Sequence, residues 1–467
     1  MRKVFVLTTL CAAVLSAAAS DTTHVKKYSA EQLKSDLAFM VQAIEEVHPN
    51  AYHSISREAF TKKYDSIQNS ITGDLTAMAA WPKFATLIGA INEGHTSISW
   101  PAGLMSDATL FFPFYTKDFD GEGFVVSFDG SEEGGLQAGD RILSINGVSA
   151  SAIYAQFRLY AGGLPAWKAV TVATRLPFYL ALHGYQGPFT IRYSRSGAVN
   201  TTTVAAQPWS RFSERVGKFR KAANAKPYTY TVLDGGIGYL NFTSMVSPTR
   251  FTQFVDSVFT TIRQQPVKGL VIDLRQNSGG NSALGDKLLE YLTTKKYRMS
   301  AGAVWKISQR YKDYYNTLQG DSRYLKNTAL EGEYLQGGNG TFIRQPAPEK
   351  KPVAQATRFT GPVCFLIGSY TFSSANMLAN AVKDYSLATL IGQPTGECPN
   401  DFGELLTLRL PHTGIDFYTS TKQYIRANGD SANPDPISPD IAVKDDPATA
   451  VDEVMEAAKQ WIERKRD

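Results

Sequence analysis

Hydrophobic positions in the first hundred residues recur at the spacing of an α-helix. Ser29 and Gln32 form a capping box, and the apolar positions after it fall on one helical face, namely Leu33, Leu37, Met40, Val41 and Ile44. Two further helical stretches follow, one from Ser56 and one near Met78. Residues 20–104 are therefore predicted to form a small N-terminal helical domain.

The pattern changes to that of β-strands after about Leu110. Strand-like stretches follow, and an alternating strand lies between the glycine turns of the string Gly135-Leu-Gln-Ala-Gly-Asp-Arg-Ile-Leu-Ser-Ile-Asn-Gly147. A helix-rich stretch occupies about 155–182. We expect a second domain over 105–200, and we interpret the polar and then basic residues 201–226 as a linker with a solvated helix.

Strands and helices alternate from about Tyr228 onward. Continuous apolar strand patterns occur at 237–242, 269–274, 363–367 and 388–391, and helical patterns occur at 251–262 and 374–384. A continuous apolar strand that follows a helix indicates a sheet covered on both faces. Residues 227–467 are therefore predicted to form an α/β core, which makes the whole chain a multidomain protein with α/β and α+β parts.

The first 19 residues have the parts of a secretory signal peptide. Arg2 and Lys3 precede a mostly apolar stretch from Val4 to Ala19, which ends in small residues. A membrane anchor is the alternative, but the stretch is shorter than the roughly 20 residues that a spanning helix needs. We expect cleavage near Ala19 and a periplasmic or secreted product.

Charge and cysteine content narrow the class of protein further. The 48 Lys and Arg against 43 Asp and Glu leave a formal charge of +5, which is too mild and too interspersed for a nucleic-acid partner. No later window predicts a stable membrane insertion. Only Cys364 and Cys398 remain after the predicted signal peptide, so stability is expected to come from packed cores and not from a disulfide framework.

Two short strings concentrate residues suited to catalysis. Asp273-Leu-Arg-Gln-Asn-Ser-Gly-Gly-Asn281 leads a buried strand into paired glycines, whose backbone N–H groups can closely approach a substrate oxygen. Gly368-Ser-Tyr-Thr-Phe-Ser-Ser-Ala-Asn-Met377 follows another strand and opens a helix, where a serine would be exposed. Taken singly, each string also fits a plain strand-to-helix turn, with Ser373 or Ser374 as a helix cap.

Together with other motifs in the same order, these strings resemble the C-terminal processing (tail-specific) serine protease family. The further motifs are Gly94-His-Thr96, the Gly135–Gly147 string, which resembles a bacterial protease PDZ domain, Gly392-Gln-Pro-Thr-Gly396 and Ser438-Pro-Asp-Ile-Ala-Val443. The resemblance implies a PDZ-like domain at 105–200, joined to a crotonase-like or Clp-like protease core with the active site between them. A PDZ-like domain binds an extended polypeptide as an added strand.

The family motif implies that Ser373 is the nucleophile, with Ser374 as the fallback, and Asn376 stands where the family usually has Glu. Bacterial tail-specific members use a lysine about two dozen residues past the serine, but that window holds Gly396-Glu-Cys-Pro399 here. The tricorn-core branch instead uses a histidine before the PDZ domain, and His95 lies in that place. A neutral imidazole can take the serine proton near pH 7; the alternative for His95 is a structural role.

A triad also needs a carboxylate to orient the imidazole. The resemblance to the tricorn-like branch points to the segment before the Pro-Asp-Ile string, where we favour Asp435 over Asp430, with Glu404 as a third option. That branch has a serine immediately before the histidine, a position taken here by Gly94. The backbone N–H groups expected to form the oxyanion hole belong to Gly279, Gly280 and Ser374.

These features predict an exported serine endopeptidase that hydrolyses peptide bonds in unfolded or C-terminal polypeptide segments, without a metal or an organic cofactor. The alternative is a non-catalytic protein on the same fold that binds an apolar ligand or a peptide. Asn376 in place of Glu, the missing lysine and the 25 Phe and 23 Tyr residues support that alternative. Labelling of the serine by a fluorophosphonate would separate the two.

Overall fold

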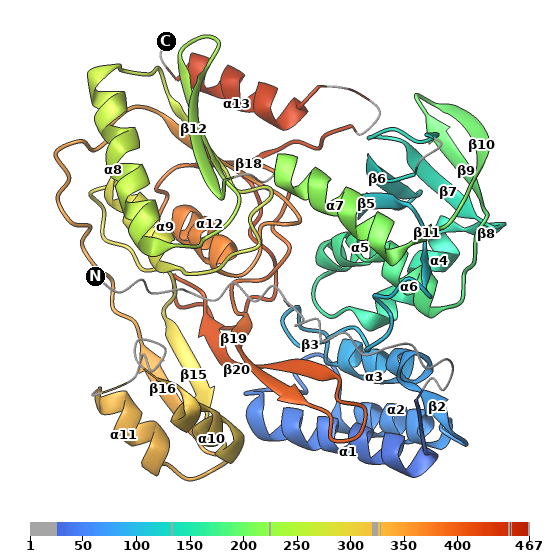
Figure 1. Ribbon diagram of the computed structural model, residues 1–467. Coiled ribbons are helices and arrows are strands. Elements are labelled where there is room, and N and C mark those ends of the chain that lie inside the picture. Colours follow the sequence, from blue (N-terminus) through green and yellow to red (C-terminus); the bar gives the residue numbers. More distant parts are fainter. Residues whose placement is uncertain are drawn as a thin grey trace.

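A computed structural model describes residues 26–465 except 132–133, 224–225, 320–325, 327, 447–448 and 450. The predicted signal peptide, residues 1–19, lies outside the described residues. None of the helices in the described part of the chain combines the length and the apolar character needed to cross a membrane. Figure 1 shows the arrangement of the elements as a mixed α/β multidomain fold.

The N-terminal segment is helical, as predicted. Its elements are β1 (Lys27–Tyr28), α1 (Ala30–Val47), α2 (Arg57–Asn69), β2 (Leu75–Thr76) and α3 (Ala77–Ile91). The capping box at the start of α1 is present, because the Ser29 and Gln32 side chains each accept the other residue's backbone N–H. The hydroxyls of Ser56 and Thr76 cap α2 and α3 by accepting the backbone N–H groups of Ala59 and Ala79.

Next along the chain comes a twisted antiparallel sheet with helices against it, which we call the middle module. Its strands are β5 (Phe114–Phe119), β6 (Phe124–Asp129), β7 (Arg141–Ile145), β8 (Val148–Ser149), β9 (Phe189–Arg195) and β10 (Ala198–Val204), in the order β10-β9-β7-β6-β5 with β8 paired to β7. Its helices are α4 (Ala150–Phe157), the 3-10 turn η1 (Arg158–Tyr160), α5 (Pro165–Thr174) and α6 (Leu176–Leu182). The predicted helix-rich stretch is therefore α4 to α6.

Residues 201–226 were expected to be a linker with a solvated helix, but most of them lie in elements that pack against the rest of the fold. Its first residues belong to β10, which forms a seven-residue pairing with β9. Then β11 (Gln207–Pro208) pairs with β4 (Leu110–Phe111), and α7 (Trp209–Ala223) buries Phe212 and Val216 against Phe111. The helix was expected to be solvated, because its basic residues obscured the apolar face that carries Phe212 and Val216.

One hydrophobic core runs through both the N-terminal helices and the middle module. Residues of α1 and α3, such as Leu37 and Phe84, belong to the same buried cluster as Phe124 and Ile142 of the module and Phe417 of a later strand. The proposed boundary near residue 104 therefore does not separate two cores.

The α/β core is built on a six-stranded sheet that is parallel except at one edge. Its order is β12 (Tyr228–Leu233), β13 (Ile237–Phe242), β14 (Leu270–Asp273), β17 (Val363–Ile367), β18 (Thr389–Gly392) and β21 (Ile441–Ala442), with β12 antiparallel to β13. One face packs against α8 (Pro248–Gln264), α9 (Ala283–Glu290) and α12 (Ser374–Asp384), and the other against α13 (Glu453–Arg464). Both faces are therefore covered, as the continuous apolar strands predicted.

A second, smaller sheet extends below this core in Figure 1. It contains β16 (Phe342–Pro346), β15 (Gly302–Lys306), β20 (Asp416–Ile425) and β19 (Phe402–Arg409), with β3 (Ser97–Ile98) paired to β20. The helices α10 (Gln309–Thr317) and α11 (Ala329–Gln336) pack an aromatic cluster around Trp305. Because β3 joins β20, this sheet ties the N-terminal segment to the α/β core.

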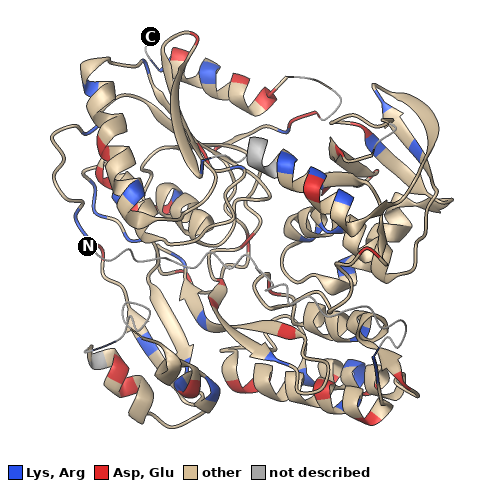
Figure 2. Ribbon diagram, in the orientation of Figure 1, with Lys and Arg blue, Asp and Glu red and all other residues tan. Residues whose placement is uncertain are grey.

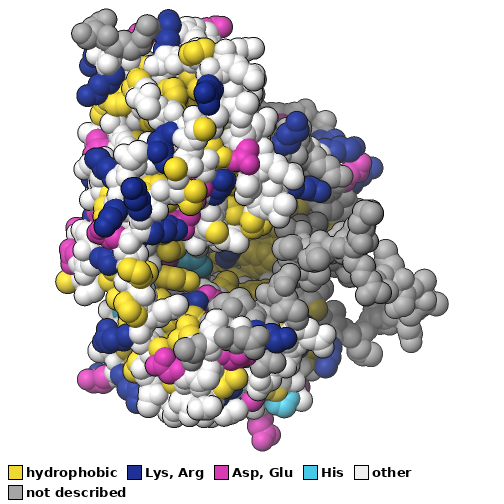
Figure 3. Space-filling model, turned by 90° about the vertical axis from the view of Figure 1, so that its left-hand side faces the viewer, with side chains coloured by type: hydrophobic (Ala, Val, Ile, Leu, Met, Phe, Trp, Pro, Cys, Tyr) yellow, Lys and Arg dark blue, Asp and Glu magenta, His cyan; other side chains and the backbone are white. Residues whose placement is uncertain are grey.

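Charges of both signs are spread over all parts of the fold in Figure 2, as the mild net charge led us to expect. Figure 3 shows a hollow in one face of the molecule, lined by hydrophobic side chains and with a histidine side chain visible at its edge. Cys364 is buried in β17, Cys398 is partly buried, and both are free thiols.

Candidate active site

Ser373 lies in a strained turn at the carboxyl end of the parallel strand β17. Its backbone has φ 53° and ψ −128°, a conformation that costs a non-glycine residue of the order of 1–3 kcal/mol. Ser373 directly precedes α12 but its side chain forms no capping hydrogen bond. The helix-cap alternative from the sequence is therefore not what this hydroxyl does.

The Ser373 hydroxyl instead faces an imidazole from the other end of the chain. His95 Nε2 lies 3.1 Å from Ser373 Oγ, although 278 positions separate the two residues. His95 sits between α3 and β3, just after Asn92 ends α3 in a left-handed conformation. The sequence-predicted pair is thus brought together at hydrogen-bonding distance.

Glu93 holds the backbone of the His95 turn. Its carboxylate accepts the backbone N–H groups of His95 (2.5 Å) and Thr96 (2.8 Å), and it also accepts the hydroxyl of Ser420 on β20 (2.6 Å). Burial alone would raise the pKa of Glu93, but the imidazoles of His48 and His95 and the Ser420 hydroxyl outweigh it and hold the pKa at about 2. A permanently charged carboxylate therefore anchors this loop.

The other imidazole nitrogen faces a pair of carboxyl groups. His95 Nδ1 lies 3.2 Å from Glu397 Oε1 and 3.7 Å from Asp401 Oδ2. Neither His95 Nδ1 nor Glu397 Oε1 has a partner of hydrogen-bond geometry in the described part of the chain, so their approach at 3.2 Å is a close contact that leaves both atoms open to a shared proton. The second Glu397 oxygen, Oε2, accepts the backbone N–H of Ser373 at 2.6 Å.

Burial and mutual repulsion keep protons on this carboxyl pair. Burial, with the nearby charge of Glu93, raises the pKa of Glu397 to about 8. Burial and the neighbouring Glu397 raise the pKa of Asp401 well above its usual range. Near neutral pH the pair therefore retains a proton that two separate carboxyl groups in water would have lost.

The structure does not bring Asp435 to the imidazole, which corrects the sequence-based choice. Asp435 and its alternative Asp430 are both exposed, and the carboxylates facing His95 Nδ1 are Glu93, Glu397 and Asp401. Glu404, the third option, pairs with the ammonium group of Lys422. The segment before the Pro-Asp-Ile string runs along the surface, and the loop between β18 and β19 enters the site instead.

Two of the three N–H groups predicted for the oxyanion hole are free to donate to a substrate oxygen. The N–H of Gly279 donates to the Asn277 side chain at 2.9 Å, so it is not available to a substrate. The N–H groups of Gly280 and Ser374 have no acceptor within the described ranges. The two segments touch, because the Ser374 hydroxyl donates to the Gly280 carbonyl at 2.6 Å, and this bond also removes Ser374 as a fallback nucleophile.

The departures from the family pattern at Gly94 and Asn376 have local explanations. A Cβ at Gly94 would lie 2.6 Å from the Phe372 ring, which leaves no room for a serine there. Asn376 is buried and its side-chain amide donates to the Cys398 carbonyl at 3.2 Å. The residue at the usual Glu position therefore tethers the loop that carries Glu397.

No lysine takes the place of His95 among the described residues. Lys383, on α12, pairs with Asp440, and Lys422, on β20, pairs with Glu404. The window in which the family has its lysine holds Glu397, which points to the imidazole. From the sequence, this window was noted only because it lacks the lysine. The carboxyl group of Glu397 in the same window could have indicated the residue that orients the imidazole.

The donor atoms of His95, Glu397 and Asp401 lie within 4.8 Å of one another, so these three residues could also hold a metal ion. Glu397 already accepts a backbone N–H with one oxygen, and His95 directs its second nitrogen at a serine hydroxyl. This arrangement suits proton transfer from an alcohol, with a carboxyl group behind the imidazole.

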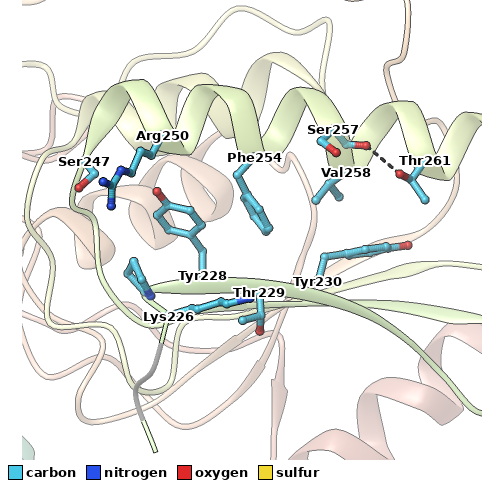
Figure 4. Close-up of a pocket in the computed structure, with 11 residues that line it drawn as sticks. Lys226, Tyr228, Thr229, Tyr230, Ser247, Arg250, Phe254, Ser257, Val258 and Thr261 are labelled. Carbon is cyan, nitrogen blue, oxygen red and sulfur yellow. Dashed lines mark hydrogen bonds between the residues drawn. The ribbon is translucent and has the colours of Figure 1, made fainter. Parts of the chain in front are cut away.

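A separate groove of about 560 Å³ lies between β12 and α8. In Figure 4 the Tyr228 and Tyr230 side chains point from β12 toward α8, and Phe254 points back toward the strand. Its lining contains hydroxyl groups and cations but no His, Cys, Asp or Glu. Without a base for a nucleophile, this groove does not compete with the Ser373 site for catalysis.

Comparisons with known proteins agree with this chemistry. Residues 236–443, which include Ser373 and Glu397, match the model of peptidase family S41. None of the curated proteins matches the chain. The matched region contains most of the α/β core and most of the smaller sheet, and it excludes His95.

Two solved structures of CPAF share the fold over nearly the whole chain. The crystal structure of a CPAF mutant has 15% sequence identity and a TM-score of 0.64, and the match covers 93% of this chain and 96% of that chain. Mature CPAF complexed with lactacystin has 14% identity and a TM-score of 0.63, with 93% and 97% covered. The photosystem II D1 C-terminal processing protease has 13% identity and a TM-score of 0.46, with 92% and 96% covered.

The chain is a serine-type peptidase, and the part of it that matches the family S41 model contains Ser373. Its substrates are accordingly polypeptides.

Proposed function

We propose that this peptidase is an exported endopeptidase in which Ser373 is the nucleophile, His95 the base and Glu397 the orienting carboxyl group. The observation that carries the proposal is the chain of contacts through one imidazole. His95 Nε2 lies 3.1 Å from Ser373 Oγ, and His95 Nδ1 lies 3.2 Å from Glu397 Oε1. Nucleophile, base and orienting group need these contacts in this order.

The reaction follows from this geometry. Ser373 Oγ attacks the carbonyl carbon of the scissile peptide while its proton moves to His95 Nε2. The N–H groups of Gly280 and Ser374 donate to the oxyanion that forms. When the C–N bond breaks, the imidazolium returns the proton to the leaving amine, and a water molecule activated by the same imidazole then hydrolyses the acyl-enzyme.

The retained protons of Glu397 and Asp401 set the charge behind the imidazole. Both carboxyl groups hold their protons more tightly than in water, so the resting site keeps little negative charge beside a neutral imidazole. A negative charge on the pair is stabilised once the imidazole takes the serine proton, which favours the transition state over the resting site. The raised pKa of Glu397, about 8, is what the proposal requires of this pair near neutral pH.

The substrate class is proposed from the middle module and the hydrophobic hollow. The module carries the Gly135–Gly147 string and presents an antiparallel sheet with α4 to α6 against it, which supports a PDZ-like role in binding extended polypeptide ends. The hydrophobic lining of the hollow in Figure 3 suits unfolded segments, which expose apolar side chains. The signal-like residues 1–19 support export, which fractionation of cells producing the full chain tests.

Hydrolysis of unfolded casein by purified variants tests the catalytic proposal. Ser373→Ala and His95→Ala are each expected to lose at least about 10³-fold in kcat/KM, because each removes a reacting group. Ser431→Ala, at an exposed serine, and Lys383→Ala, on α12, should retain the wild-type rate. Full activity of Ser373→Ala, or loss of activity in Lys383→Ala but not in His95→Ala, would contradict the assignment.

Chelation tests the metal alternative at the same residues. Because the serine mechanism needs no metal ion, dialysis against EDTA should leave casein hydrolysis unchanged. A loss that added zinc reverses, together with an active Ser373→Ala variant, would instead favour a metal centre at His95, Glu397 and Asp401.

A further inference from the structure

A single indole lies where the three loops of the proposed active site meet. Trp167 is on α5, in the middle module, and its ring stacks on Phe372 with a centroid separation of 3.8 Å and an interplanar angle of 12°. Phe372 immediately precedes Ser373. The Phe372 ring also lies 4.7 Å from the imidazole of His95, so the indole, the phenyl ring and the imidazole form one aromatic row.

The other two loops approach the same indole closely. A Cβ at Gly94, next to His95, would lie 3.1 Å from Trp167 Nε1. A Cβ at Gly396, next to Glu397, would lie 3.2 Å from Trp167 Cε3. Trp167 therefore contacts the residue directly before each of the three proposed triad members.

The segment before α5 adds a second contact with the His95 loop. A Cβ at Gly162 would lie 2.2 Å from the Glu93 carbonyl oxygen, so the two backbones pack directly together. The far end of α5 is fixed in the module, where Val172 and Ala173 are buried and the Thr116 hydroxyl donates to the Ala173 carbonyl at 2.6 Å. The helix thus connects the core of the middle module to the catalytic loops.

We propose that Trp167 is a positioning residue of the active site, through which the middle module holds the loops of His95, Ser373 and Glu397 in register. This inference rests on the proposed function of those three residues. Trp167 acts through Phe372, Gly94 and Gly396 and takes no part in proton transfer. A positioning error of about 1 Å at a reacting group costs on the order of 10²-fold in rate.

The expected result of Trp167→Ala is therefore a drop in kcat of about 10²-fold with KM changed by less than about threefold. Trp167→Phe keeps a ring against Phe372 and should recover most of the rate. Trp461→Ala is the matched control, because Trp461 is a partly buried indole on α13 that packs against a different cluster. It should react as the wild type does.

The measurement is the second-order rate at which a small fluorophosphonate labels Ser373, mapped by mass spectrometry, alongside kcat and KM on a casein-derived peptide. A small probe reports the geometry of the serine and the imidazole without needing the peptide-binding surface. Slow labelling of Trp167→Ala with recovery in Trp167→Phe supports the proposal. A wild-type labelling rate in folded Trp167→Ala, or a raised KM with unchanged kcat, overturns it.

Two further outcomes are distinguishable. If Trp167→Ala does not fold, Trp167→Leu is compared with Trp167→Phe at a temperature where both are folded, and equal labelling rates overturn the proposal. If the wild type itself is not labelled at Ser373, the proposed function fails, and the positioning role falls with it. If the wild type is labelled at Ser373 and the Trp167 variants are labelled at the same rate, only the positioning role is contradicted.

Discussion

The proposed chemistry uses a residue whose window in the sequence was noted but given no role. Glu397 stands where tail-specific proteases have a lysine, and in the structure its carboxyl group lies 3.2 Å from His95 Nδ1. Asp435, which the family resemblance favoured, is exposed. The motif window gives the position of Glu397 in the sequence, but only the folded loop shows that its carboxyl group faces His95 Nδ1.

Replacing the carboxyl group by an amide tests this reassignment. Glu397→Gln should lower kcat/KM by about 10²-fold or more, because an amide cannot ionise and therefore offers no negative charge when the imidazole becomes an imidazolium. Asp435→Asn should leave the rate within about twofold, since surface substitutions rarely matter. Casein hydrolysis by the two variants checks the prediction, and the reverse ranking would restore Asp435 as the third residue.

Stability should depend on pH through the same carboxyl group. Burial raises the pKa of Glu397 from 4.5 to about 8, so between these values the folded protein holds a proton that the unfolded chain has released. This contribution to the free energy of unfolding is fully present below about pH 4.5 and is lost as the pH rises through about 8. Glu397→Gln should therefore show a shallower fall in stability over this range.

Urea unfolding between pH 5 and 9 measures this difference, with Asp435→Asn as the control that should follow the wild type. Parallel pH profiles for the wild type and Glu397→Gln would show that Glu397 does not retain its proton in the folded protein.

At the scale of elements, the sequence predicted most of the α/β core, because continuous apolar strands and amphipathic helices have distinct periods. The strand at Val363–Ile367 and the helix at Ser374–Asp384 were both predicted at their observed positions. The polar stretch before Tyr228 was misread as a linker, since β10 has only one buried residue among seven and α7 carries many charges. Half-buried elements at an edge of the fold have a weak hydrophobic periodicity. Whether such a segment forms a strand or a helix depends on its tertiary packing.

The glycine turn after β14 lets the backbone at Gly279 approach the turn that carries Ser373. A Cβ at Gly279 would lie 2.7 Å from Ser373 Cβ, and the φ of Gly279 is +100°. Gly279→Ala should therefore reduce the free energy of unfolding by about 1–3 kcal/mol and nearly abolish activity, because it displaces the nucleophile.

Gly332→Ala is the matched control on helix α11, where a Cβ meets nothing within 4 Å. It should stabilise the protein by up to about 1 kcal/mol and leave activity unchanged. Thermal unfolding and casein hydrolysis of both variants test the prediction. Equal effects of the two substitutions would show that the close approach of Gly279 to Ser373 does not constrain the site.

At the scale of the whole molecule, the proposed active site is an assembly of three loops that come from distant parts of the chain. His95 follows the N-terminal helices, and Ser373 and Glu397 follow strands of the α/β core. The N-terminal helices share one hydrophobic core with the middle module, and β3 pairs with β20 next to the His95 turn. The order of motifs along the sequence predicted which segments take part, whereas their contacts depend on this packing.

The central claim is that His95 activates Ser373. The most direct test is the rate at which a fluorophosphonate labels the wild type and His95→Ala, with the labelled peptide identified by mass spectrometry. We predict labelling of the wild type at Ser373 alone, and a rate at least about 10³-fold lower in His95→Ala, with circular dichroism unchanged. Equal rates in the two proteins, or labelling of a different residue in the wild type, would contradict the claim.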